Sequence, residues 1–108
     1  TELAAAELIR HGVTTCVDMY FYASEAAEVL GEAGLRGLVT QGTIDFPGPE
    51  NWQDFSSVEK GLNVLLKTIQ KYPKIRAGLG PHAPYSCSDE RLRHMAGLRD
   101  RYGIPISI

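Results

Sequence analysis

The stretch SEAAEVLGEAGLRGLVTQGT, residues 24–43, predicts one helix that leads directly into one strand. Ser24 is a favourable N-cap, and we expect the helix to run to about Ala33 before Gly34 ends it. Leu35–Thr43 follows at once and is expected to form the strand. The predicted buried side of the helix consists of Ala26, Ala27, Val29 and Leu30.

The same helix-to-strand unit recurs along the rest of the chain. We expect further helices over Glu2–His11, from the Ser56-Ser57 pair to just before Pro73, and from Ser88 to Gly103, and further strands over Val13–Tyr20, Ile75–Gly80 and Ile104–Ile108. Largely apolar strands are typical of parallel sheets that are covered on both faces. Strict alternation of helices and strands is compatible with two architectures, an open doubly wound sheet or a (β/α)8 barrel. No G-x-G-x-x-G turn follows a strand, so nothing indicates a dinucleotide-binding sheet.

The longest connections, 21–24, 44–54 and 82–88, all follow strands. The carboxyl ends of the strands are where barrels build their active sites. A full barrel needs eight strands and about 250 residues, whereas this chain has 108 residues and four predicted strands. An isolated half barrel would expose two strand edges and an apolar inner face. We therefore expect residues 1–108 to form a partial barrel domain that belongs to a longer chain.

Composition and charge exclude several classes of protein. With 44% hydrophobic and 22% charged residues, the chain resembles folded domains and not disordered ones. A net charge of −2 offers no basic surface for nucleic acid or an anionic membrane, and no apolar run reaches the roughly 18 residues that a membrane span needs. Cys16 and Cys87 are too few and too distant for a disulfide framework. We expect reduced thiols and a cytoplasmic location, with no nucleic-acid or membrane partner.

The segment GPHAPYSCS, residues 80–88, contains the strongest candidate for a functional side chain. Pro81 and Pro84 restrict the backbone on both sides of His82, which follows the predicted third strand. Neutral imidazole donates from one nitrogen and accepts at the other, so it suits a heterocycle or a developing charge. His82 is predicted to contact a substrate; the plainer interpretation is a hydrogen-bonded loop histidine.

Other candidates lie at strand ends and helix starts. Asp18 closes the first predicted strand, and Glu25 follows the predicted N-cap; each is either a ligand contact or a local structural group. Asp45 favours a turn-forming role, and Gln41 suits either a substrate contact or a structural one. No H-x-H, H-E-x-x-H or C-x-x-C motif occurs, so the sequence predicts no self-sufficient metal site.

Two segments resemble the amidohydrolase superfamily, IRHGVTTCVDMYF at residues 9–21 and GLGPHAPYSCSDE at residues 78–90. Within the superfamily, the likeness is closest to the S-adenosylhomocysteine/5′-methylthioadenosine deaminases and the related chlorohydrolases. It covers essentially the whole chain in order, and the His-Ala-Pro-Tyr segment is its most specific part.

The resemblance implies a (β/α)8 barrel with one divalent metal ion, zinc or a similar ion, which activates water to attack a ring carbon and expel ammonia. In the family, this ion is held by an H-x-H pair, a fifth-strand histidine and an eighth-strand aspartate. None of these ligands lies in this sequence, in which Pro105–Ile108 would start the fifth strand. By the same likeness, His82 matches a substrate-contacting histidine after the fourth strand. Ser24 or Glu25 falls where the deaminases place a ribose-contacting glutamate, and Tyr85 is a further substrate-contact candidate.

We therefore expect a parent enzyme that hydrolyses an aminated or chlorinated purine-like or triazine-like ring and binds a divalent metal, chiefly zinc. This segment alone should bind no metal and be inactive, and the parent could be a homo-oligomer. Two alternatives stay open. The chain could be an independent half barrel that self-associates or binds a partner without catalysis, or a small thiol hydrolase that uses Cys87 and His82.

Overall fold

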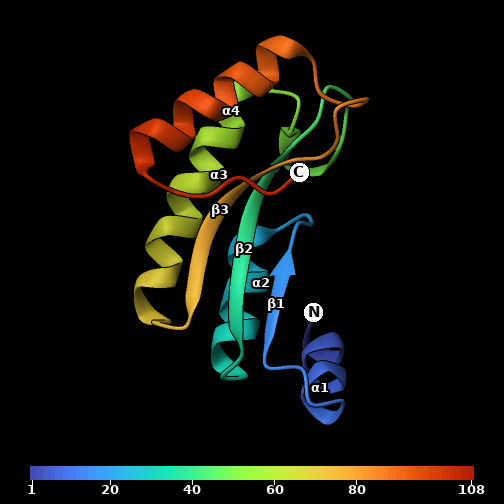
Figure 1. Ribbon diagram of the computed structural model, residues 1–108, viewed down its shortest axis with the longest axis vertical. Coiled ribbons are helices and arrows are strands. Elements are labelled where there is room, and N and C mark those ends of the chain that lie inside the picture. The colour runs from blue at the N-terminus through green and yellow to red at the C-terminus, as the bar shows by residue number, and fades with distance from the viewer.

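The computed structural model describes all of residues 1–108 as alternating helices and strands (Figure 1). The α-helices are α1 (Glu2–Arg10), α2 (Ala23–Glu32), α3 (Phe55–Thr68) and α4 (Asp89–Tyr102), and the strands are β1 (Thr15–Asp18), β2 (Arg36–Thr43) and β3 (Ile75–Pro81). Two short 3-10 helices, η1 (Pro49–Asn51) and η2 (Ile69–Lys71), lie before and after α3. No helix is both long enough and apolar enough to cross a membrane.

The three strands form one parallel sheet in the order β1-β2-β3. Ile106 continues this order, because it bridges Leu79 of β3 in parallel. Strands that pair in sequence order, each reached through a helix, are the arrangement of a barrel, whereas a doubly wound sheet reverses its order at a switch point. The fold is therefore a segment of a (β/α)8-type barrel, which confirms the predicted partial barrel.

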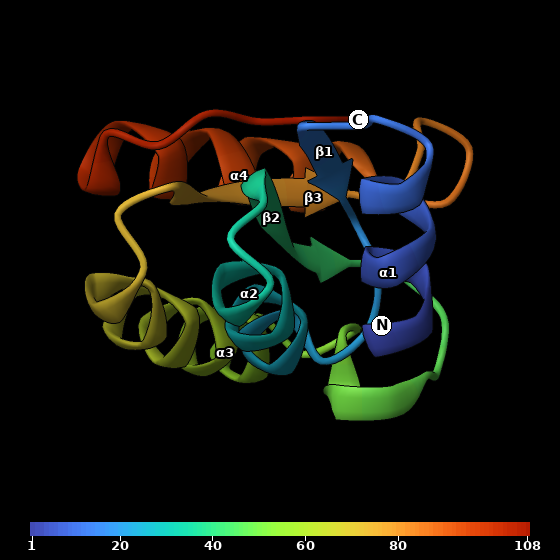
Figure 2. The same ribbon diagram turned by 90° about the horizontal axis from the view of Figure 1, so that it is seen from below.

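The helices pack on one face of this sheet. Ile75, Ala77 and Leu79 are every second residue of β3, so their side chains point to the same face of the sheet. Ile75 and Ala77 belong to a buried cluster with residues of α1, α2, β2 and α3, and Leu79 belongs to a second cluster with residues of α3 and α4. Figure 2 shows α2 and α3 side by side next to the strands, with α4 adjacent to β3. The opposite face is the inner face of the barrel segment.

Small residues line this inner face near the carboxyl ends of the strands. Gly42 of β2 and Gly80 of β3 lie beside each other in the register. A Cβ atom at Gly42 would stand 1.9 Å from Cη2 of Trp52, and one at Gly80 would stand 2.8 Å from Cγ of Met19. The two glycines therefore let Trp52 and Met19 pack directly against the strand backbones.

The second helix does not use its predicted cap. Ser24 is predicted as the N-cap, but α2 begins at Ala23 and Tyr22 occupies the cap position in the left-handed region, with φ 61°. The Ser24 hydroxyl donates instead to the Glu25 carboxylate at 2.7 Å. The backbone amide of Tyr22 donates to the Glu50 carboxylate, so a side chain of η1, in the connection after β2, satisfies the helix start.

The other helix boundaries are close to those predicted. α3 begins at Phe55, slightly before the predicted start, because the Asp54 carboxylate caps it by accepting a hydrogen bond from the Ser57 amide at 2.7 Å. Ser88 and Gly103 bound α4 as predicted, with Gly103 in the left-handed region at φ 63°.

The predicted fourth strand, 104–108, is reduced to a single bridge at Ile106. Leu79 donates its amide hydrogen to the Pro105 carbonyl at 2.9 Å and accepts from the Ser107 amide at 2.9 Å. Pro105 has no amide hydrogen to donate in return, so the ladder does not extend toward the start of β3.

β1 is shorter and more exposed than predicted. It spans Thr15–Asp18 instead of Val13–Tyr20, and Val17 on its inner face is 61% exposed. β1 is the edge strand of the sheet. The prediction that strands are covered on both faces is therefore wrong for β1.

Candidate functional site

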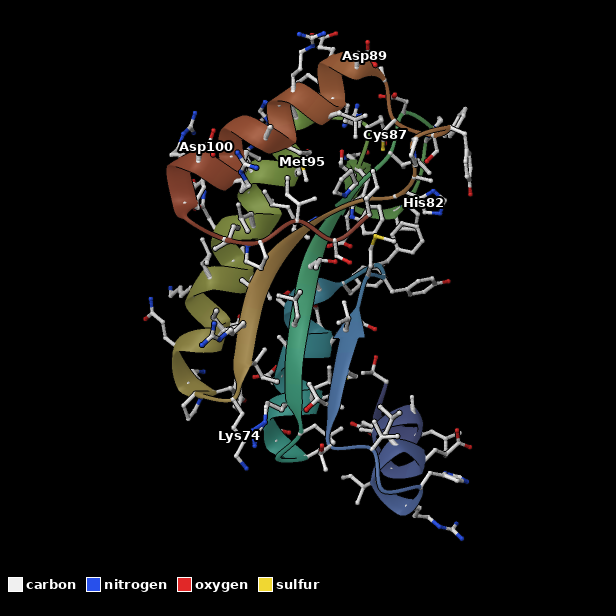
Figure 3. All side chains as sticks on the ribbon, viewed as in Figure 1. Lys74, His82, Cys87, Asp89, Met95 and Asp100 are labelled. Atoms are coloured by element: carbon white, nitrogen blue, oxygen red, sulfur yellow. The ribbon has the colours of Figure 1, made fainter.

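His82 lies directly after β3, at the carboxyl end of the sheet, as the sequence predicted. Its backbone amide donates to the Thr43 carbonyl oxygen at 3.1 Å, which fixes the start of the loop on β2. Its Nδ1 atom lies 2.8 Å from Oγ of Ser86, whereas Nε2 makes no hydrogen bond. Figure 3 shows His82 and Lys74 at opposite ends of the strands. The imidazole of His82 is thus anchored through one ring nitrogen and free at the other.

The loop 82–88 contains two more predicted residues. Tyr85 is 84% exposed, and its ring stands edge-on to the imidazole of His82 with 6.1 Å between the ring centroids. Cys87 is buried, and its thiol donates to the Thr43 carbonyl oxygen at 3.5 Å. No hydrogen bond joins this thiol to the imidazole, whose Nδ1 is already bonded to Ser86. The geometry therefore does not support a thiol–imidazole pair.

Arg91, in the first turn of α4, is a buried cation that holds the loop after β2. Its guanidinium makes hydrogen bonds to acceptors in the segment 43–53: Asp45 Oδ1 at 2.5 Å, Thr43 Oγ1 at 2.5 Å, the Gln53 carbonyl at 2.6 Å and the Trp52 carbonyl at 3.1 Å. The ring of Phe55 lies 4.6 Å from Cζ of Arg91. The residue is only 4% exposed, so the charge is buried but fully paired.

Asp45 connects that loop to the loop of His82. One carboxylate oxygen accepts from Nε of Arg91, and the other accepts from the backbone amide of Ser88. The Asp45 amide in turn donates to the Ser86 carbonyl at 3.0 Å. The hydrogen bond from Arg91, followed by those from Ser88, holds the pKa of Asp45 below its ordinary value. Asp45 is thus a structural group, as the turn interpretation implied, but it links two loops.

Two aromatic side chains, those of Phe21 and Trp52, pack together beside Gly42. Trp52 is 3% exposed, and its ring centroid lies 4.4 Å from that of Phe21. The indole Nε1 is buried and has no hydrogen-bond partner. Trp52 therefore covers the inner face at Gly42, and Phe21 packs against the indole.

Three residues of this region carry no prediction from the sequence: Ser86, Arg91 and Trp52. A signal existed for Arg91, because it stands four residues before Met95 and seven before Leu98, on the buried face of α4. Ser86 and Trp52 lie in loops, where no periodic pattern indicates burial.

Ser24 and Glu25 lie together in the first turn of α2. They are bonded to each other, and no hydrogen bond or ring contact joins either of them to His82 or Tyr85. The structure therefore brings His82, Tyr85 and Ser86 into one group and leaves Ser24 and Glu25 as a separate pair.

Asp18 and Gln41 both point toward the helical face of the sheet. Asp18 lies beside Val39, and Gln41 lies beside Leu79, two residues of the buried clusters. A Cβ atom at Gly61 of α3 would stand 2.6 Å from Oε1 of Gln41, so this amide fills the space between sheet and helix. Burial raises the pKa of Asp18, whose Oδ2 atom has no hydrogen-bond partner. The contacts of Gln41 favour its structural interpretation, whereas the Asp18 carboxylate makes no hydrogen bond that would do the same.

No group of three or more His, Cys, Asp or Glu side chains is placed to hold a metal ion. The atoms at the carboxyl end of the sheet that could ligate a metal already have partners. Nδ1 of His82 contacts Ser86, the Cys87 thiol donates to a carbonyl oxygen, and the Asp45 carboxylate is paired with Arg91. The residues of this chain therefore do not fit a metal site of their own.

The amidohydrolase family model matches residues 1–108. The chain is 40% identical over 113 residues to a 5-methylthioadenosine/S-adenosylhomocysteine deaminase of Saccharophagus degradans, covering 100% of this chain and 24% of that protein. It is 37% identical over 109 residues to a 5′-deoxyadenosine deaminase of Methanocaldococcus jannaschii, covering 100% of this chain and 26% of that protein.

A solved structure has the same fold. The adenosine deaminase of Xanthomonas campestris, crystallised with bound zinc, superposes with a TM-score of 0.85 at 31% identity, covering 96% of this chain and 24% of that one. The chain thus spans about a quarter of the length of the proteins that it matches.

Proposed function

Because the chain belongs to the amidohydrolase family, we propose that it is part of a hydrolytic deaminase that acts on an aminated, purine-like ring. The observation that carries this proposal is the placement of His82 at the carboxyl end of β3, anchored through Nδ1 and free at Nε2. In this proposal His82 touches the substrate and orients its ring.

The relatives support a substrate class. One is named for 5-methylthioadenosine and S-adenosylhomocysteine, another for 5′-deoxyadenosine, and the structural neighbour for adenosine. These compounds share an adenine ring on a ribose-type sugar. We therefore propose a 5′-modified adenosine as the substrate, and a chlorinated purine-like or triazine-like ring as the second class.

The residues of the chain suit different parts of such a substrate. Nε2 of His82 forms a hydrogen bond to the polar edge of the ring. Phe21, half-buried and packed against the buried Trp52, offers an apolar ring that suits the face of a heterocycle. Tyr85 is exposed beside His82, and Ser24 or Glu25, in the first turn of α2, is proposed to line the pocket on the sugar side.

The hydrolysis also requires a divalent metal ion, which we propose to be zinc, as in the structural neighbour. Its ligands would come from outside residues 1–108, because this chain forms no ligand group. Alone, these residues are therefore proposed to be inactive. The free thiols of Cys16 and Cys87 favour a reducing compartment, the cytoplasm.

Product release by the complete protein tests this function: ammonia from an aminated ring and chloride from a chlorinated one. The substrates are 5′-deoxyadenosine, 5′-methylthioadenosine and S-adenosylhomocysteine, with a chlorinated triazine for the second class. We expect turnover of at least one 5′-modified adenosine, abolished by a metal chelator and restored by zinc. If the zinc-loaded protein releases nothing from any of these compounds, the proposal is wrong.

The edge position of β1 and the exposed side chains on and beyond this strand favour one alternative function. Val17 is 61% exposed and Tyr20, just beyond β1, is 68% exposed. A second copy that covered this edge would make the chain a self-associating half barrel without catalysis. A dimer of the 11.9 kDa chain with no deaminase activity would support this alternative. A single polypeptide several times larger would exclude it.

A further inference from the structure

We propose that Ser86 is a positioning residue that holds neutral His82 in the tautomer with its hydrogen on Nδ1, so that Nε2 presents a lone pair to the substrate. The statement about the substrate rests on the proposed function. The statement about the tautomer depends only on the geometry of the loop 82–88.

A count of hydrogens around Ser86 leads to this tautomer. The Ser86 hydroxyl oxygen lies 2.8 Å from Nδ1 of His82 and 3.2 Å from the carbonyl oxygen of Ala83. A hydroxyl has one hydrogen, and a carbonyl oxygen can only accept. If Ser86 donates to Ala83 and accepts from Nδ1–H, both contacts are hydrogen bonds. If Ser86 donates to Nδ1, its oxygen faces the Ala83 oxygen with no hydrogen between them.

Ser86 has little freedom to change this arrangement. It is 3% exposed, although the neighbouring Tyr85 is 84% exposed. Its amide donates to the Ala83 carbonyl at 3.1 Å, and its own carbonyl accepts from the Asp45 amide at 3.0 Å. The backbone of Ser86 is thus held from two sides, and its hydroxyl oxygen is held by the contacts with Nδ1 of His82 and the Ala83 carbonyl.

The whole loop is tied down at both ends. At the start, the His82 amide is bonded to the Thr43 carbonyl. At the end, the Ser88 amide is bonded to the Asp45 carboxylate, which is also paired with Arg91 at 2.5 Å. Because the guanidinium of Arg91 is buried and fully bonded, the end of the loop has a rigid support.

This tautomer limits what His82 can recognise. A neutral imidazole with a bare Nε2 accepts one hydrogen bond and donates none to the substrate. The group opposite must then be an N–H or O–H donor, such as the exocyclic amine of an adenine ring or a sugar hydroxyl. An unprotonated ring nitrogen, which can only accept, does not fit this position.

Nuclear magnetic resonance tests the tautomer directly. In the complete protein, labelled with 15N in histidine only, long-range 1H–15N correlations distinguish a protonated ring nitrogen from a bare one. At a pH where His82 is neutral, we expect a protonated Nδ1 and a bare Nε2. His11 serves as the internal reference, because its Nδ1 lies 2.7 Å from the Glu7 carbonyl and has to donate. A bare Nδ1 with Nε2–H on His82 would overturn the proposal.

Variants of Ser86 separate positioning from simple folding. Ser86→Ala is expected to let His82 take the Nε2–H tautomer and to lower kcat/KM about fivefold, the contribution of one hydrogen bond. Ser86→Thr retains the hydroxyl and should keep the Nδ1–H tautomer. Ser56→Ala, at an exposed serine of α3, is the matched control and should change neither readout. If Ser86→Ala leaves the tautomer of His82 unchanged, Ser86 does not position it.

The two proposals fail in different ways. A protein that deaminates a 5′-modified adenosine but carries Nε2–H on His82 refutes the role of Ser86 and leaves the function intact. A protein with Nδ1–H on His82 and no deaminase activity refutes the function and leaves the tautomer intact. If the variants do not fold, the spectrum of the unmodified protein still decides the question.

Discussion

The guanidinium of Arg91 and the carboxylate of Asp45 meet at 2.5 Å, and 46 residues of sequence separate them. Their ion pair joins α4 to the loop after β2, and through Ser88 it fixes the loop that carries His82. The Arg91 side chain is 5% exposed and that of Asp45 is 31% exposed. Since an unpaired buried charge is costly, this pair makes the arrangement of the two loops depend on both partners.

Loss of Arg91 should therefore destabilise the protein. Arg91→Met removes a buried cation and leaves the carbonyls of Trp52 and Gln53 without their donor. We expect a loss of about 3 kcal/mol in the free energy of unfolding, as for other broken buried pairs. Equilibrium denaturation in urea measures it. Arg93→Met, at an exposed position of the same helix, is the control and should change stability by less than about 0.5 kcal/mol.

The same ion pair predicts sensitivity to acid. The pKa of Asp45 is lower in the folded protein than in the unfolded chain, so its stabilising effect is fully present above the unfolded pKa of about 4. It is lost as the pH falls from there through the lower folded pKa. Asp45→Asn should flatten the fall in stability over this range. The flattening should be incomplete, because hydrogen bonds from Ser57 lower the pKa of Asp54 too. An unchanged acid profile in Asp45→Asn would contradict this role.

Gly42 should not tolerate a side chain. In Gly42→Ala the new Cβ would stand 1.9 Å from Trp52, so the indole has to move from the inner face of β2. We expect a loss of about 1–3 kcal/mol, typical of overpacking, and a red shift in the fluorescence of Trp52, the one tryptophan of the chain. Gly97→Ala is the matched control. A Cβ atom at Gly97 of α4 would meet no other atom within 4 Å, so alanine there should raise stability by about 0.5–1 kcal/mol.

Neither cysteine should act as a nucleophile. Cys87 is buried and bonded to a carbonyl, and burial, followed by the charge of Asp18, raises the pKa of the Cys16 thiol. We expect slow alkylation of both thiols in the folded protein. Cys87→Ala should keep kcat/KM within about twofold, since surrounding contacts change little. Fast alkylation of Cys87 in the folded protein, together with loss of activity in Cys87→Ala, would instead support the thiol hydrolase alternative.

The sequence predicted the architecture because its signals are local. Gly34 and Gly103 end helices, Ser88 caps one, and apolar periodicity marks the buried sides, all of which act within a few residues. The sequence favoured the barrel because no glycine-rich turn follows a strand and because two segments resemble the amidohydrolase superfamily. The strand order that confirms it, β1-β2-β3 with Ile106 beside Leu79, is a long-range property that no local pattern shows.

The candidate site was predicted less completely for the same reason. His82 could be found because Pro81 and Pro84 flank it at a strand end. Ser86 gains its importance from contacts that no local pattern encodes, and Ser24 lost its predicted capping role because Glu50, from a distant loop, bonds the helix start. Arg91 is charged, and charged residues are rarely buried unless they are paired with a distant group.

The most direct test of the central claim is the kcat/KM for deamination of the best 5′-modified adenosine by the complete zinc-loaded protein and by its His82→Ala variant. His11→Ala, at an exposed helix end, is the matched control. We predict that His82→Ala lowers kcat/KM by about 100-fold or more, because the ring loses its orienting contact, while His11→Ala retains the activity of the unmodified protein. A folded His82→Ala protein that remains within about threefold of the unmodified protein, less than one hydrogen bond contributes, would contradict the account.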